Sequence, residues 1–173
     1  MKARTLFSIM VMVLFTAPVL AAESGLVPER IVLVHVKTLL DSGNDRTVLV
    51  PRVIAAALQK GRKVILLFDS DGVQSLKTGG WFGGDSTPLD RVDITEKERQ
   101  HLAGLLGTTP DGIPDIYGSL LHFFKGREVA VYVNKKALRY RGIDDYHFDH
   151  VAEAIEEDRI VELLTRADRY IAY

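Results

Sequence analysis

The chain has 173 residues, of which 22 are Lys or Arg and 23 are Asp or Glu, and its formal net charge is −1. This balance argues against a general nucleic-acid-binding protein, which would carry a strong basic excess. With 47% hydrophobic and 26% charged residues, the composition is that of a folded globular chain. The sequence contains no cysteine, which excludes disulfides, zinc–thiolate sites, iron–sulfur clusters and thiol catalysis.

The N-terminal segment is predicted to be a secretory signal peptide. Lys2 and Arg4 precede an apolar stretch at residues 6–15, and small residues follow up to Ala22. This order of a basic, an apolar and a small-residue region is typical of a cleaved signal. The apolar stretch is short for a membrane-spanning helix, which needs about 20 residues. We therefore expect residues 1–22 to direct a secreted or periplasmic location, with no membrane attachment after cleavage.

Residues 23–173 are predicted to form one α/β domain. Apolar runs rich in β-branched residues predict buried strands. These runs are residues 30–36, 63–69, 128–133 and 169–173, with a weaker one at 148–152. A strand, a helix and a second strand follow one another at the start of this domain. Such a βαβ unit makes a parallel sheet with a right-handed crossover.

The first predicted helix has signals at both ends. Apolar residues recur at helical spacing after Thr47, and Gly61 stands where a glycine that ends a helix belongs. Pro51 is tolerated only in a first turn, so we expect this helix to start near Thr47. The last predicted helix covers residues 159–166.

Residues 74–107 do not follow the alternation of strands and helices and are interpreted as an insertion. Within them, Thr95 and Glu98 have the spacing of a capping box, which predicts a short helix. The next helix has a strongly apolar face. Asp111 is its expected N-cap, which would place Pro114 in the first turn.

Several segments together carry a family resemblance. They are Asn44-Asp45 before the Ala-rich stretch 55–57, Gly61 with Val64, and the segments 68–73, 134–143 and 160–169. In order and spacing, across roughly residues 30–173, they resemble the DsrE/DsrF-like family of small α/β proteins associated with sulfur relay. The resemblance implies a three-layer α/β/α fold with a parallel sheet of about five strands, flavodoxin-like in outline. It also implies a homo-oligomer, commonly a trimer or hexamer.

The chain departs from this family at the positions that matter for sulfur chemistry. Sulfur-handling relatives often place cysteine after the third strand, sometimes as a C-x-x-C pair. The corresponding positions here are Asn134 and Ala137. Neither can carry a persulfide, which needs a nucleophilic thiolate. Sulfur transfer by a cysteine route is therefore excluded for this chain.

Polar residues follow three predicted strands at their carboxyl ends, the edge at which open parallel sheets bind ligands. The candidate ligand-binding residues are His35, Lys37, Asp69, Asp71, Asn134 and Lys135. His35, Asp69 and Asp71 could also exchange protons. The alternatives are a half-buried His35 bonded to a backbone carbonyl, and turn or cap roles for the two aspartates.

The Gly-rich segment 79–84 carries Trp81 and Phe82. Glycine hinges could let Trp81 cover the ligand site as a lid, and the alternative is that both rings pack against the body or a neighbouring subunit. The segment lacks the G-x-G-x-x-G pattern of a dinucleotide site, and no cofactor is expected.

Two further motifs are weighed and set aside. His147, Asp149 and His150 are types that bind zinc, nickel, copper or iron, but their spacing matches no established metal motif. We favour a solvated loop there and expect no metal. Ser70 lacks the G-x-S-x-G pattern of a serine hydrolase.

Three functions remain open from the sequence. The leading hypothesis is an exported binding or assembly module that holds a small ligand or a partner protein at the strand carboxyl ends. The second is a cysteine-independent enzyme that uses His35, Asp69 and Asp71. The third is an exported metal-binding protein. No nucleic-acid partner is expected.

Overall fold

Five strands form one sheet in the order β4-β3-β2-β1-β5, and every neighbouring pair is parallel. They are β1 (Ile31–Val36), β2 (Lys63–Phe68), β3 (Ala130–Asn134), β4 (Glu153–Ile155) and β5 (Arg169–Ala172). The computed structural model describes residues 30–79, 84 and 86–173, so the predicted signal peptide and Trp81 lie outside the described residues. Within those ranges, no helix is both long and apolar enough to span a membrane.

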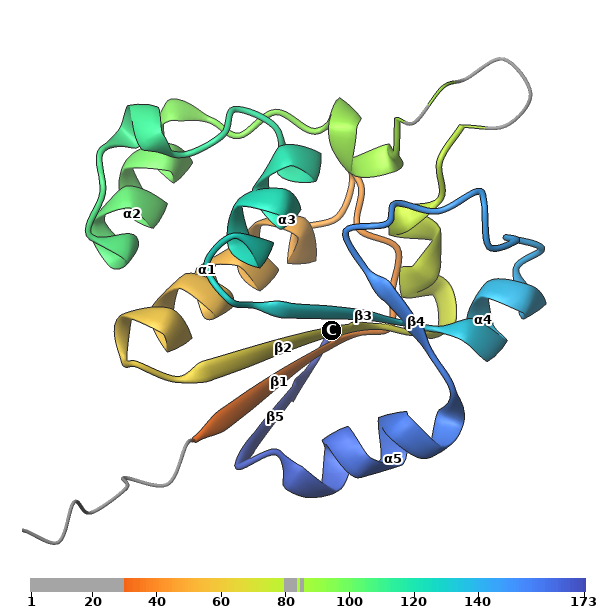
Figure 1. The fold of residues 1–173 in the computed structure, drawn as a ribbon. Helices are drawn as coiled ribbons and strands as arrows, with labels where there is room; N and C mark the ends of the chain where they lie inside the picture. Colours follow the sequence, from red (N-terminus) through yellow and green to blue (C-terminus); the bar gives the residue numbers. More distant parts are fainter. Residues whose placement is uncertain (1–29, 80–83, 85) are drawn as a thin grey trace, which may run out of the picture.

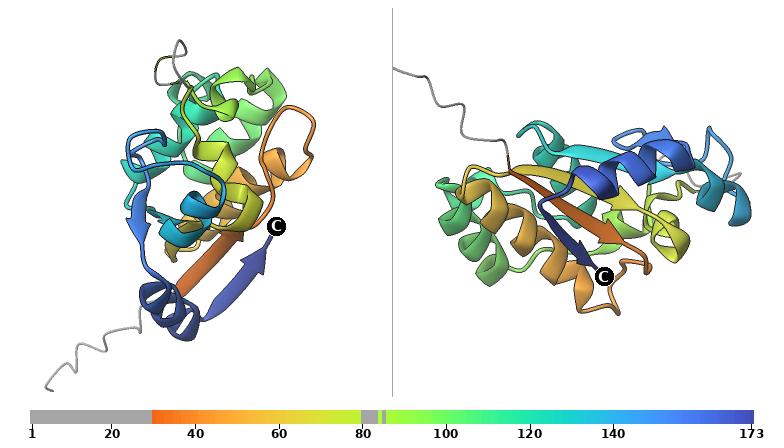
Figure 2. Two further views of the ribbon diagram at one scale, coloured as in Figure 1. Left: turned by 90° about the vertical axis from the view of Figure 1, so that its right-hand side faces the viewer. Right: turned by 90° about the horizontal axis from the view of Figure 1, so that it is seen from below.

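Helices cover the two faces of the sheet unequally. They are α1 (Arg46–Gln59), α2 (Glu96–Leu106), α3 (Tyr117–Lys125), α4 (Lys135–Tyr140) and α5 (Glu157–Arg166), with short 3-10 helices η1 (Ser70–Leu76), η2 (Pro88–Arg91) and η3 (Pro110–Gly112). Helices α1, α2 and α3 lie over one face, whereas α5 lies over the other (Figures 1 and 2). The three-layer α/β/α fold with a parallel five-stranded sheet is confirmed.

The order in which strands are added to the sheet changes side between β4 and β5. From β1 it adds β2, β3 and β4 on one side, and α5 then carries it back to place β5 on the free side of β1. The strand pairing aligns His35 of β1 with Leu67 of β2 and with Ala172 of β5. Ligand sites of parallel sheets lie outside the carboxyl ends of the strands, and His35 is close to that end of β1.

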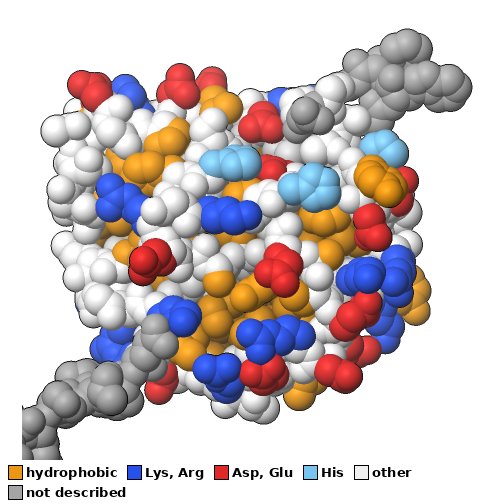
Figure 3. Space-filling model, viewed as in Figure 1, with side chains coloured by type: hydrophobic (Ala, Val, Ile, Leu, Met, Phe, Trp, Pro, Cys, Tyr) orange, Lys and Arg blue, Asp and Glu red, His pale blue; other side chains and the backbone are white. Residues whose placement is uncertain are grey.

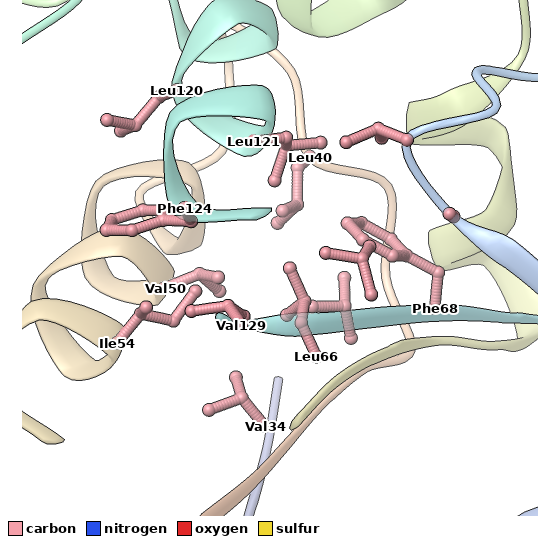
Figure 4. Close-up of a cluster of buried hydrophobic side chains, with 14 of the residues drawn as sticks. Val34, Leu40, Val50, Ile54, Leu66, Phe68, Leu120, Leu121, Phe124 and Val129 are labelled. Atoms are coloured by element: carbon pink, nitrogen blue, oxygen red, sulfur yellow. The ribbon is translucent and has the colours of Figure 1, made fainter. Parts of the chain in front are cut away.

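Alternation along the strands divides the core in two. Val34 and Leu66 belong to the larger cluster, where they meet α1 and α3 through side chains such as Ile54 and Phe124 (Figure 4). Leu33 and Leu67 point to the opposite face and join a smaller cluster under α5. Because both faces are covered, these strands are nearly continuous apolar runs. His35 shares the α5 face with Leu33, because residues two apart in a strand share a face.

The signals at the ends of α1 and α2 are largely confirmed. Gly61 has a φ of 62° just after α1, as a glycine that ends a helix should. The Thr95 side chain accepts a hydrogen bond from the backbone N–H of Glu98 at the start of α2. Helix α1 begins at Arg46, so Pro51 lies in its second turn and not in the first as expected.

Two predicted boundaries are wrong, because long-range pairing overrides the local signal. Helix α3 begins at Tyr117 and not near Asp111, since Ile116 forms an antiparallel bridge with Asp93 that holds the preceding residues extended. The strand expected at residues 148–152 lies at Glu153–Ile155. Phe148 instead forms an isolated antiparallel bridge with Lys77 of the insertion.

Candidate functional site

An open groove of about 490 Å³ lies at the carboxyl edge of the sheet, between the ends of β2 and β3. Its polar and aromatic lining residues are Asp69, Ser70, Asn134, Lys136, Tyr140 and Arg141. The first two follow β2, Asn134 ends β3, and the rest lie on α4 or directly after it. Figure 3 shows Lys and Arg side chains gathered over α4. The groove is therefore polar, with a basic rim.

Asp69 is the hub of the hydrogen-bond network at the floor of this groove. It stands between β2 and η1 in an extended conformation, and its Oδ1 accepts the backbone N–H of Ser70 at 2.7 Å. The same oxygen accepts Nδ2 of Asn134 at 2.8 Å. Its Oδ2 lies 3.1 Å from Nε2 of His35. The chain turns sharply here, since Ser70 has a φ of 50°.

These contacts stabilise the charged form of Asp69. The His35 hydrogen bond, with further help from Ser70 and Asn134, lowers the pKa of Asp69 from 3.8 to about 2, although burial opposes the shift. The carboxylate is therefore ionised at neutral pH and acts only as a hydrogen-bond acceptor.

His35 is held between two side chains. It is only 5% exposed, and its Nδ1 lies 2.9 Å from the hydroxyl oxygen of Tyr170 while its Nε2 faces Asp69. The His35 and Tyr170 rings meet edge to face with centroids 5.7 Å apart. His35 therefore bonds to two side chains and not to a backbone carbonyl, which was the alternative expected from the sequence.

Tyr170, His35 and Asp69 form a row of hydrogen-bonded side chains. The charge on Asp69 determines which atoms of this row carry protons. Because an ionised carboxylate only accepts, Nε2 of His35 must carry the proton of that bond. In the neutral imidazole, Nδ1 is then the acceptor, and the Tyr170 hydroxyl donates to it. Hydrogen bonds thus run in one direction from Tyr170 through His35 to Asp69, across β5, β1 and the end of β2.

Asn134 has a structural role at the corner between β3 and α4. Its Oδ1 accepts the backbone N–H groups of Lys136 at 2.9 Å and Ala137 at 3.3 Å, which caps α4. Its Nδ2 donates to Asp69. One amide side chain therefore joins the β3–α4 corner to the β2–η1 corner and fixes the groove floor.

The other sequence candidates lie at or beyond the edge of this network. The Asp71 carboxylate pairs with Arg141 on the groove rim. Lys37 is exposed, and its carbonyl oxygen accepts the Asp71 N–H at 3.2 Å. The Lys135 ammonium lies 3.1 Å from Glu156, away from the groove. The structure thus joins His35, Asp69 and Asn134 directly, places Asp71 nearby, and leaves Lys37 and Lys135 outside.

Sequence reasoning missed several residues of the site. They are Tyr140 and Tyr170, together with Ser70, which was weighed only as a hydrolase nucleophile. Lys136 and Arg141 belong to a basic run that could bind an anion but that is more often a solvated helix face. Alternation places Tyr170 on one face of the last strand, but linking it to His35 requires the strand order.

The metal candidates do not converge. His147 is bonded to Asp144 at 2.6 Å, whereas Asp149 faces His122 at 3.2 Å. His150 lies against the Phe148 ring with centroids 4.9 Å apart. Across residues 30–79, 84 and 86–173, no three His, Cys, Asp or Glu residues are grouped to hold a metal ion.

Comparisons with known proteins establish the fold. Neither a protein-family model nor a curated protein matches the chain. The crystal structure of the YchN protein from E. coli is similar with a TM-score of 0.50 and 18% identity, covering 84% of this chain and 99% of that one. A protein of unknown function, MTH1491 from Methanobacterium thermoautotrophicum, gives a TM-score of 0.49 and 15% identity, covering 83% and 99%. The fold of this chain is therefore DsrE-like, as the sequence resemblance implied.

Proposed function

We propose that this protein is an exported DsrE-like binding module that holds a small organic anion in the groove between the ends of β2 and β3. The preorganised floor of the groove supports its role as the binding site. The Asp69 and Asn134 side chains are fixed by mutual and backbone hydrogen bonds. A floor whose polar groups are already oriented loses little entropy when a ligand binds.

The rim of the groove supports an anionic ligand. Lys136 and Arg141 both line it, and their partners Glu157 and Asp71 are more than half exposed. Exposed ion pairs of this kind are weak, so a bound anion can compete with the two carboxylates. An anion placed here would be attracted by both cations.

An aromatic ring and a hydroxyl complete the groove. Tyr140 is 82% exposed, which leaves its ring open for contact with a planar ligand. Ser70 is exposed as well, and its hydroxyl has no hydrogen-bond partner among the described residues. These features favour an aromatic or hydroxylated carboxylate. The proposal rests above all on the convergence of Lys136, Arg141 and Tyr140 over the Asp69–Asn134 floor.

The test uses 4-hydroxybenzoate, with phenol as its uncharged counterpart. We expect 4-hydroxybenzoate to shift the backbone amide NMR signals of Ser70, Ala137 and Tyr140, and phenol to shift them much less. The double variant Lys136→Gln/Arg141→Gln should weaken binding about tenfold or more, since it removes both charges. Arg127→Gln is the control, because Arg127 stacks on Phe123 away from the groove. Absent shifts, or equal binding by the double variant, would overturn the proposal.

We also propose that the protein assembles as a homo-oligomer, most simply a trimer, through the α5 side. Val161 and Leu164 lie one turn apart on α5 and are 54% and 39% exposed. Figure 3 shows hydrophobic side chains at the surface between the sheet and α5. Exposed apolar groups that lie together favour association. A protein partner at this side is the alternative.

Light scattering coupled to size-exclusion chromatography tests the assembly. The residue 23–173 form should elute as an oligomer at micromolar concentration, and Val161→Lys/Leu164→Glu should dissociate it. Leu49→Glu on α1 is the matched control, because Leu49 is 44% exposed on the opposite face. A monomer at that concentration contradicts the assembly proposal. Cell fractionation with N-terminal sequencing tests export, and a cytoplasmic, uncleaved chain would contradict it.

A further inference from the structure

We propose that Tyr170 is a reactive hydroxyl, activated by His35 and Asp69, that accepts an acyl group from an activated carboxylic ester. The site lies where β5 and β1 meet, on the other side of Asp69 from the groove. It does not depend on the ligand or on the assembly proposed above. The observation that carries it is the row of side chains from the Tyr170 hydroxyl to the Asp69 carboxylate.

The order of groups in this row is that of a nucleophile, a base and an orienting carboxylate. The Tyr170 oxygen lies 2.9 Å from Nδ1 of His35, and Nε2 of His35 lies 3.1 Å from Oδ2 of Asp69. Both distances are within the reach that base activation of a hydroxyl requires. The same logic operates on unrelated folds with serine or cysteine as the nucleophile, and it is recognised by geometry rather than by sequence motif.

The surroundings fit these roles. His35 is 5% exposed, so its base nitrogen, Nδ1, is shielded from bulk water. The partner of that nitrogen is the Tyr170 hydroxyl. Tyr170 is 49% exposed, so a reagent can reach it from solvent. Asp69 is kept ionised by Ser70 and Asn134 as well as by His35, which supplies a fixed negative charge for the imidazolium that would form.

The chemical step balances without an outside oxidant or reductant. The Tyr170 oxygen attacks the ester carbonyl carbon while its proton passes to Nδ1 of His35. The bond between that carbon and the leaving oxygen then breaks, and the leaving group departs as an alcohol with the proton from His35. The products are an O-acyl ester of Tyr170 and the free alcohol.

The chain contains good internal controls for this reaction. Tyr140 and Tyr146 are 82% and 86% exposed, so each is more accessible than Tyr170. If acylation followed accessibility alone, these two tyrosines would react first. If the row of His35 and Asp69 activates the hydroxyl, Tyr170 reacts first despite its lower exposure.

The experiment uses 4-nitrophenyl acetate with the intact 23–173 protein and peptide mapping by mass spectrometry. We expect acetylation of Tyr170 to be about 100-fold faster than that of Tyr140 or Tyr146, the size of effect that a positioned base supplies. His35→Gln should remove this advantage without changing the rates of the other two. Asp149→Asn is the matched control and should leave the rate at Tyr170 unchanged, since Asp149 pairs with a different histidine, His122.

Asp69 is a positioning residue, and its test needs a measurement that folding alone would not alter. In the wild-type protein we expect the Tyr170 rate to rise with pH, because general-base catalysis uses the unprotonated form of the base. Asp69→Asn keeps the shape but offers a donor to Nε2, which favours the wrong His35 tautomer. The variant should lose that pH dependence while its circular dichroism stays native. The proposal is overturned if Tyr170 reacts no faster than Tyr146, or if the His35→Gln and folded Asp69→Asn proteins keep the wild-type rate and pH profile.

Discussion

The carbonyl oxygen of Val36 lies 2.2 Å from the point that a Cβ atom on Gly72 would occupy. This close approach brings η1 against the end of β1. The same carbonyl oxygen accepts the backbone N–H of Asp69 at 2.9 Å. The absence of a side chain at position 72 therefore lets the β2–η1 corner pack tightly enough to hold Asp69 beside His35.

Gly72→Ala should destabilise the protein by about 1–3 kcal/mol, because the new methyl group would overlap backbone atoms that cannot easily move. Gly104→Ala in α2 is the control, since nothing lies within 4 Å of its would-be Cβ. It should stabilise the protein by about 0.5–1 kcal/mol through helix propensity. Urea unfolding of both variants measures the two effects. Equal stability of the two alanine proteins would show that the corner can relax.

The depressed pKa of Asp69 makes stability depend on pH in the acid range. The pKa falls from 3.8 to about 2 in the folded state, with the His35 hydrogen bond as its largest cause. Since the folded state holds the proton less tightly, the contribution is present above pH 4 and is lost as pH falls towards 2. It is worth at most about 2 kcal/mol. The stability difference between wild type and Asp69→Asn should shrink over that range, and a constant difference would contradict the shift.

A buried carboxylate links α1 to α2. The Glu98 side chain is 5% exposed and accepts Nε of Arg52 at 2.8 Å and 3.0 Å through its two oxygens. Arg52→Met leaves this charge without its partner, and we expect a loss of about 2 kcal/mol or more. Adding Glu98→Leu should recover part of that loss. Arg159→Ala, which breaks an exposed pair with Glu162, should leave the urea midpoint unchanged.

Tyr117 should resist ionisation in the folded protein. Burial, with a smaller contribution from the Glu98 charge, raises the pKa of Tyr117 from 10.0 to about 12. Because the unfolded chain loses this proton first, stability should fall as pH rises from about 10 to 12. Tyr117→Phe should show a smaller fall, as measured by urea unfolding at pH 9 and 11. An identical fall in both proteins would assign the effect to other groups.

Local patterns predicted the elements well where packing agreed with them. The apolar runs ending at Val36 and Phe68 are strands because both of their faces are covered, and such strands need no polar alternation. The Thr95 cap predicted the start of α2 because a cap acts within one turn of its helix. The capping box was only half right, since the Glu98 carboxylate turned to Arg52, which is distant in sequence.

The errors have the same physical origin. The start of α3 and the position of β4 depend on bridges from Ile116 to Asp93 and from Phe148 to Lys77. Each bridge joins residues more than 20 positions apart along the chain. A helix or strand signal is read over a few neighbouring residues, so it contains no information on such partners.

The sequence alone determined that the domain is α/β with parallel strands, because the spacing of apolar residues records which side of each element is buried. It also excluded thiol chemistry, since no cysteine is present. Only the tertiary structure decided that Tyr170, His35, Asp69 and Asn134 form one row. That row exists because β5 pairs with β1 rather than with β4, and strand order is set by packing between distant segments that no local pattern encodes.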